Sequence, residues 1–133
     1  MPTIHVNIQQ DDDSSSTAQV REHALTMDRP EAKGGQDKGP MGGEALLMGL
    51  GGCFMSNLLA AAKARGLQLR DARAEITGEL ADAPARYVKV NMTVSAQCEP
   101  AKELPKLVVI AERGCLVANT LRKAVDLTIE CSG

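Results

Sequence analysis

The sequence predicts an α+β fold in which an antiparallel sheet curls around one long, cysteine-bearing helix. Segments with alternating apolar residues lie on both sides of a long apolar segment at residues 44–65. These candidate strands come in groups rather than alternating regularly with helices, which favours α+β over a parallel α/β sheet. The chain has 133 residues, a common size for one domain, so we expect a single domain over residues 1–133.

The N-terminal third is expected to contain two strands and a long loop. Apolar residues alternate within residues 3–9 and predict the first strand. The acidic, serine-rich residues 10–16 predict a turn, and residues 17–27 a second strand. Residues 28–43 contain two prolines and five glycines and predict a loop. Loops of this length are usually functional or disordered.

The segment at residues 44–65 is apolar around almost its whole circumference. At ~1.5 Å per residue it would span about 30 Å, the thickness of a membrane core. Its glycines, together with Ser56 and Asn57, lower its hydrophobicity, and no second segment of this kind occurs in the chain. We therefore expect a buried central helix rather than a membrane span, ending at Arg65 and Gly66.

A β-hairpin is predicted after the long helix. Apolar residues alternate within residues 72–80 and again within residues 88–96. The stretch ADAPAR at residues 81–86 supplies the turn between the two strands.

Two helices and a last strand complete the prediction. The apolar spacing within residues 104–111 is that of one helix face, and Gly114 ends this helix. Residues 115–124 predict a further short helix, and residues 125–131 alternate as a strand.

Composition excludes several classes of partner and cofactor. The net charge of −2 and an aromatic content of 2% argue against nucleic-acid binding, which needs a basic surface or stacking rings. The only histidines, His5 and His23, have no metal-ligand spacing with the cysteines, so we expect no metal and no other cofactor. No signal peptide is recognisable, which predicts a cytoplasmic protein with free thiols.

The cysteines are the candidate chemistry. Cys53 lies in the middle of the long helix, and Cys115 follows Gly114 at the start of the next helix. Each could be a packed small hydrophobe or a reactive thiol, and composition leaves both readings open. Cys98 and Cys131 are expected to serve in packing only.

A reactive thiol needs a positive neighbour, because the thiolate is the nucleophile. No histidine is close in sequence, so the candidates are arginines: Arg29 in the long loop or Arg21 in the second predicted strand. Glu44, at the head of the helix, could orient such a guanidinium through a bidentate pair.

Taken together, these residues resemble the OsmC/Ohr superfamily, the osmotically inducible and organic hydroperoxide resistance proteins. The stretch GPMGGEALLMGLGGC resembles the family's pattern through its central helix, and Cys115 opens a segment similar to the family's second motif, C-x-V-x-x-T-L. The separation of the two cysteines, 115 − 53 = 62 positions, is also similar. The resemblance is dense in motifs from about Asp28 onward.

The resemblance implies an intertwined homodimer of OsmC-like fold with active sites at the subunit interface. It implies that Cys53 is the peroxidatic thiol, which reduces an organic hydroperoxide, and that Cys115 is the resolving thiol. A dithiol such as a lipoylated protein would then reduce the disulfide. An arginine, for which Arg29 is favoured because it precedes the motif loop, and Glu44 would hold Cys53 as thiolate.

One departure concerns the glutamate. In the hydroperoxide-resistance branch it lies ten residues before the cysteine, a position that Gly43 occupies here, whereas Glu44 lies nine residues before, as in more general OsmC-like members. The leading hypothesis is therefore an OsmC-like thiol peroxidase of oxidative-stress defence. The alternative is a non-peroxidatic member that binds a small apolar ligand in the dimer cavity, and a third reading makes the chain an interaction module whose thiols only pack.

Overall fold

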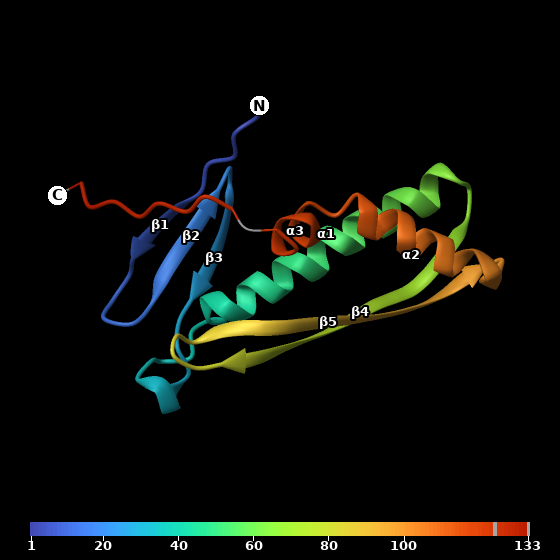
Figure 1. Cartoon of the computed structure of the whole chain (residues 1–133). Helices are drawn as coiled ribbons and strands as arrows, with labels where there is room; N and C mark the ends of the chain where they lie inside the picture. The colour runs from blue at the N-terminus through green and yellow to red at the C-terminus, as the bar shows by residue number, and fades with distance from the viewer. Residues whose placement is uncertain (124, 133) are drawn as a thin grey trace. The chain divides into compact units, whose positions relative to one another are not determined.

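The computed structural model describes residues 1–123 and 125–132. The chain forms two compact units, Met1–Leu46 and Leu47–Gly133, whose boundary lies within the long helix. Each unit has its own antiparallel sheet, and all long helices follow the first sheet in sequence (Figure 1). The α+β prediction is confirmed, but the strands of one chain form two sheets where the sequence suggested one.

The sheet of the first unit is a meander of three short strands in the order β1-β2-β3. Its strands are β1 (Asn7–Gln10), β2 (Ser16–Val20) and β3 (His23–Met27). The prediction of one strand over residues 17–27 was wrong, because the chain reverses at Arg21, whose φ is 53°.

The first predicted strand is also shorter than expected. Of residues 3–9, only the last three belong to β1, which pairs with β2 from Asn7 opposite Gln19 to Gln10 opposite Ser16. Apolar alternation before Asn7 therefore marks a segment that has no neighbouring strand within this sheet.

The second unit contains most of α1 (Gly42–Ala64), the hairpin of β4 (Gln68–Ala81) and β5 (Arg86–Glu99), and two further helices, α2 (Leu104–Arg113) and α3 (Leu116–Leu121). The predicted hairpin and both predicted helices after it are confirmed. The hairpin pairs from Gln68 opposite Glu99 to Ala81 opposite Arg86. In Figure 1, α1 and α2 lie over the same face of this long hairpin.

One stripe of α1 supplies the centre of the core. Leu50, Phe54 and Leu58 recur every four residues and are at most 6% exposed, so they lie on one face of the helix. They pack with Leu107 and Ala111 of α2. The inward-facing residues of the hairpin complete this cluster, and they include Leu69, Ala72, Ile76, Val90, Met92, Val94 and Cys98.

Another face of α1 is exposed in the part of the chain that the structure describes. Met48 is 60% exposed and Leu59 is 49% exposed, and their separation of 11 residues places them on one face, away from Phe54. The helix is long and apolar enough to cross a membrane by length and composition, a test that core helices of soluble proteins also pass. The expectation of a helix buried all round was therefore wrong for the single chain.

A close approach explains one of the helix glycines. A Cβ added at Gly51 would lie 2.6 Å from Cδ1 of Ile76, so the absent side chain lets α1 approach β4. Gly52, by contrast, has no such neighbour within 4 Å.

The C-terminal residues 125–132 are not a strand, contrary to the prediction. The described strands pair only with one another, so this segment lacks the hydrogen-bonding neighbour that a strand needs. Its alternating apolar residues are exposed: Val125 is 66% exposed, Leu127 76% and Ile129 88%.

Candidate functional site

The corner between α2 and α3 brings Cys115 into the core beneath α1. Gly114 ends α2, and Cys115 is the N-cap of α3, where its Sγ accepts a hydrogen bond from the N–H of Ala118 at 3.5 Å. The Cys115 side chain is fully buried and belongs to the same cluster as Phe54.

The structure brings Cys53 and Cys115 together. Cys53 is half-buried on α1, on the flank of its buried stripe, and its sulfur interacts with the Cys115 thiol and with the first backbone N–H groups of α3. Hydrogen bonds from Val117 N–H, from the Cys115 thiol and from Leu116 N–H outweigh burial and lower the pKa of Cys53. Cys53 is therefore the thiol of this pair that ionises more readily.

The same arrangement keeps Cys115 protonated. Burial is the main reason that the pKa of Cys115 is raised, and the adjacent Cys53 sulfur raises it further. The pair thus consists of one thiol that is favoured as thiolate and a second thiol that keeps its proton to higher pH.

Hydrogen bonds from side chains hold the α2–α3 corner in place. Asn57, one turn after Cys53 on α1, donates from Nδ2 to the carbonyl oxygen of Ala111 at 3.5 Å. Asn119 of α3 donates to the carbonyl oxygen of Arg113 at 3.2 Å, and Arg122 forms an ion pair with Glu112. These contacts position Cys115 relative to Cys53.

Glu44 caps the helix in the single chain. Its Oε1 accepts a hydrogen bond from the N–H of Met41 at 2.8 Å, the reciprocal half of a capping box at the start of α1. Glu44 and Cys53 are nine positions apart on a regular helix, which is about 13.5 Å along the axis and about two and a half turns. The two side chains therefore project from opposite faces of α1.

The two candidate arginines lie in the first unit, both exposed. Arg21 forms the tip of the β2–β3 hairpin. Arg29 follows β3 and lines a pocket of about 490 Å³. This pocket has an apolar part formed by Ile8, Met27 and Met41, and its polar lining comes from Ser14, Ser16, Asp28, Arg29 and Lys33.

The other two cysteines differ from each other. Cys98 is half-buried and packs on the core cluster, in agreement with its predicted packing role. Cys131 is exposed, because the strand expected to bury it does not form. Among residues 1–123 and 125–132, no group of three or more His, Cys, Asp or Glu side chains could hold a metal ion.

Two features of this region were missed by sequence reasoning. The first N–H groups of α3 lower the pKa of Cys53, whereas the sequence suggested only side chains, those of Arg29, Arg21 and Glu44, as stabilising groups. Asp28, which is 4% exposed, organises the loop that carries Arg29. The available signal for Asp28 was an aspartate directly before a glycine-rich loop, since such side chains often bind nearby backbone N–H groups.

The sequence model for the OsmC-like proteins matches residues 35–130. No curated protein matches the sequence significantly. Several solved structures match over most of the chain.

The OsmC-like protein of Mycoplasma pneumoniae matches with a TM-score of 0.80 and 22% identity, covering 91% of this chain and 88% of that one. An OsmC-like protein of unknown function from Vibrio cholerae matches with a TM-score of 0.70 and 13% identity, covering 90% and 94%. An organic hydroperoxide resistance protein, OsmC, from Legionella pneumophila matches with a TM-score of 0.64 and 19% identity, covering 92% and 90%. At these identities the likeness establishes the fold.

Proposed function

Because the chain belongs to the OsmC-like protein family, we propose that it is a cysteine-dependent peroxidase that reduces organic hydroperoxides in defence against oxidative stress. The observation that carries the proposal is the pairing of Cys53, whose pKa is lowered, with Cys115, whose pKa is raised. The names of some structural relatives, such as the hydroperoxide resistance proteins of Legionella pneumophila and Elizabethkingia anophelis, agree with it.

In the proposed reaction the Cys53 thiolate attacks the distal oxygen of the hydroperoxide ROOH. The O–O bond breaks, its electron pair leaves with RO⁻, and protonation gives the alcohol ROH, while Cys53 becomes a sulfenic acid. The Cys115 sulfur then attacks the sulfenic sulfur, releasing water and forming a Cys53–Cys115 disulfide. A dithiol such as a lipoylated protein reduces the disulfide and is itself oxidised to a disulfide.

The lowered pKa of Cys53 supports this proposal over the ligand-binding alternative. A pure binding protein has no need of a thiolate, whereas a nucleophile gains reactivity as its ionised fraction rises. We further propose that Arg29 stabilises the Cys53 thiolate and that Glu44 orients its guanidinium.

The helix geometry supports a second copy of the chain as part of each site. A glutamate two and a half turns from Cys53 on the same regular helix cannot reach that thiol or an arginine bound to it. We therefore propose that the Glu44 carboxylate at each site comes from the other subunit of a homodimer.

The exposed apolar residues of the single chain agree with a dimer. The segments before β1 and after residue 124 expose Ile4, Val6, Val125, Leu127 and Ile129, and the uncovered face of α1 exposes Met48 and Leu59. Large exposed apolar areas in a chain of this size mark interaction surfaces. In the proposed intertwined dimer these segments lie against the other subunit, where the strands of both chains make a sheet that curls around the central helices. We further propose a cytoplasmic location, where a dithiol reductant would be available.

Treatment with cumene hydroperoxide and titration of free thiols tests the function. The wild-type protein is expected to lose two of its four thiols and to yield a peptide linked through Cys53 and Cys115. The Cys53→Ser variant should lose hydroperoxide turnover entirely, and the Cys115→Ser variant should accumulate a sulfenic acid that dimedone traps at Cys53. Cys98→Ser is the matched control and should behave as wild type.

Retention of all four thiols by the wild type under excess hydroperoxide would overturn the peroxidase proposal. Tight binding of an apolar ligand by that same unreactive protein would favour the ligand-binding alternative instead.

A further inference from the structure

We infer that Asp28 is a positioning residue that fixes the backbone of Arg29 and so sets the direction in which its guanidinium leaves the loop, for the role proposed for it at the Cys53 thiolate. The inference rests on the proposed function, in which Arg29 stabilises that thiolate. It assigns a role to a residue that itself contacts neither the thiol nor the substrate.

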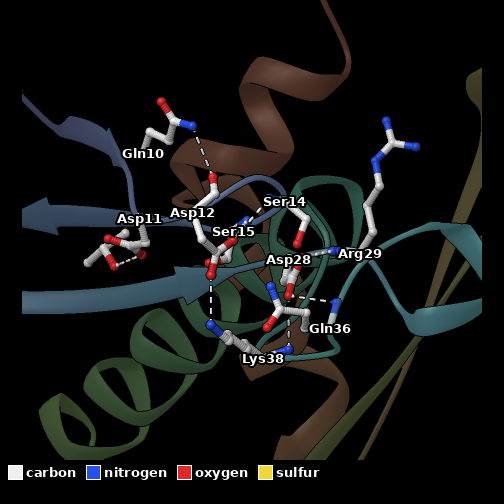
Figure 2. A network of polar contacts seen from close by, with 10 residues as sticks. Gln10, Asp11, Asp12, Ser14, Ser15, Asp28, Arg29, Gln36 and Lys38 are labelled. Carbon is white, nitrogen blue, oxygen red and sulfur yellow. Dashed lines mark hydrogen bonds and ion pairs between the residues drawn. The ribbon is translucent and has the colours of Figure 1, made fainter.

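The Asp28 carboxylate lies at the centre of the loop that follows β3. Its Oδ1 accepts a hydrogen bond from the N–H of Arg29 at 2.7 Å, and its Oδ2 accepts from the N–H groups of Gln36 at 3.1 Å and Lys38 at 3.3 Å (Figure 2). The Asp28 residue is 4% exposed. One buried carboxylate thus joins the first residue of the loop to two residues near its end.

The backbone of Arg29 is held from its other side as well. Its carbonyl oxygen accepts a hydrogen bond from the N–H of Asp37 at 3.0 Å. Gly35 packs directly on it, since a Cβ added at Gly35 would lie 2.0 Å from the same carbonyl oxygen. The peptide groups on both sides of the Arg29 Cα therefore have fixed partners, and the direction in which the side chain leaves the loop is set.

The Arg29 side chain itself is not used by this network. In Figure 2 the guanidinium extends away from Asp28, and no dashed contact joins it to the residues drawn. Arg29 is exposed and lines the pocket whose apolar part includes Met27 and Met41. Among the described residues none pairs with this guanidinium, so a cation whose backbone is held in this way is suited to bind an anion supplied from elsewhere.

A second carboxylate ties the same loop to the β1–β2 turn. Asp12 accepts from the N–H groups of Ser14 at 3.0 Å and Ser15 at 2.8 Å, and its Oδ2 forms an ion pair with Nζ of Lys38 at 2.7 Å. Lys38 therefore connects the two carboxylates, through its N–H to Asp28 and through its ammonium group to Asp12. The ion pair between Lys38 and Asp12 is more exposed than the Asp28 carboxylate.

The test replaces Asp28 with asparagine and follows Cys53. The asparagine side chain keeps one acceptor oxygen for the N–H of Arg29 but presents an NH₂ group toward the N–H groups of Gln36 and Lys38. The hydrogen bonds that join the two ends of the loop are therefore lost. In D28N the pKa of Cys53, measured from the pH dependence of its alkylation rate, should rise toward that of R29A, and hydroperoxide turnover near neutral pH should fall severalfold. The matched control is D37N, which removes one exposed negative charge from the same loop and, as asparagine, tolerates the φ of 54° at that position.

A double-mutant cycle separates positioning from general loss of structure. If Asp28 acts through Arg29, D28N should have no further effect on the Cys53 pKa in the R29A background. An equal effect of D28N with and without Arg29, or a Cys53 pKa unchanged in a folded D28N protein, would overturn the inference. Far-UV circular dichroism and thermal unfolding establish folding, and D28E serves as a second variant that retains the charge if D28N does not fold.

An inactive wild-type protein with no thiol loss contradicts the peroxidase. An active wild type whose D28N variant matches D37N contradicts only the role of Asp28.

Discussion

The Cys115 thiol hydrogen-bonds to the sulfur of Cys53, and this contact lowers the pKa of Cys53 while it raises the pKa of Cys115. The two thiols are 62 positions apart in sequence (115 − 53 = 62) and are brought together because α2 ends at Gly114 and α3 begins at once. The order of ionisation within the pair is therefore a property of the fold.

Alkylation of the native protein should be selective for Cys53. At pH 7, iodoacetamide should modify Cys53 well before Cys115, because each unit between two thiol pKa values changes the ratio of thiolate fractions about tenfold. Because the pKa of Cys53 is lowered and the pKa of Cys115 is raised, the Cys53 thiolate forms at a lower pH than an ordinary thiolate and the Cys115 thiolate at a higher pH.

Mass spectrometry of the time course checks this order. A C131S background removes the exposed thiol that would otherwise compete. Faster labelling of Cys115 than of Cys53 in the native protein would contradict the assignment.

A dimer is expected to depend on the uncovered face of α1. Replacing Met48 or Leu59 with lysine places a charge on a face that the proposed partner subunit covers, so the variants should be monomeric, with turnover reduced because Glu44 of the partner subunit is lost. Sedimentation velocity measures the change. Val109→Lys on α2, at a residue 45% exposed, is the control and should leave the mass unchanged.

Gly51 should not tolerate alanine. The added Cβ would lie 2.6 Å from Cδ1 of Ile76, and such overpacking costs about 1–3 kcal/mol, more than the up to ~1 kcal/mol that alanine gains in helix propensity. Urea unfolding of G51A is therefore expected to show a lower free energy of unfolding than wild type.

Ile76→Val removes the atom responsible and should recover part of the loss in the G51A background. On its own, Ile76→Val is expected to cost about 0.5–1.5 kcal/mol. Simple addition of the two losses in the double variant would mean that the close approach of α1 to β4 is not the cause.

Acid should loosen the loop that carries Arg29. Burial opposes ionisation of Asp28, but backbone donors, that of Arg29 first, hold its pKa below the ordinary value, and the ion pair with Lys38 lowers the pKa of Asp12. A carboxyl with a depressed folded pKa stabilises the fold above its unfolded pKa of about 3.9 and loses that contribution as pH falls through its folded pKa.

The protein should therefore lose stability as pH falls below about 4, and this loss should be smaller in D28N, which has less to lose. Hydrogen exchange at the amides of Gln36 and Lys38 reports the loop directly. Protection of these amides that stays constant as pH falls until the wild-type protein unfolds, after correction for intrinsic exchange, would count against the carboxylate as their acceptor.

The predictable part of the fold came from local patterns. Alternation predicted β4 and β5, helical spacing predicted α2, and both were correct because each segment buries its apolar face within the same unit. The predicted strand at residues 125–131 failed for the opposite reason, since its alternating side chains have no covering surface in one chain. Periodicity shows which residues are suited to burial but does not identify the surface that buries them.

The candidate site was predicted unevenly for a similar reason. The cysteines stand out by residue type and by their motifs, and the structure brings them together. The thiolate-stabilising groups at the start of α3 are backbone N–H groups, which every non-proline residue carries, so no letter in the sequence marks them. Asp28 was overlooked because its role depends on Gln36 and Lys38, eight and ten positions away.

The use of Cys115 as the cap of α3 has a practical consequence. The amide of Ala118 donates to the Cys115 sulfur, and the amide of Val117 donates to the sulfur of Cys53. The N–H groups of two adjacent residues are thus sensitive to the chemical state of the two sulfurs. In a protein labelled with nitrogen-15, the amide chemical shifts of residues 117 and 118 would therefore report whether the two cysteines are reduced or oxidised, without any attached probe.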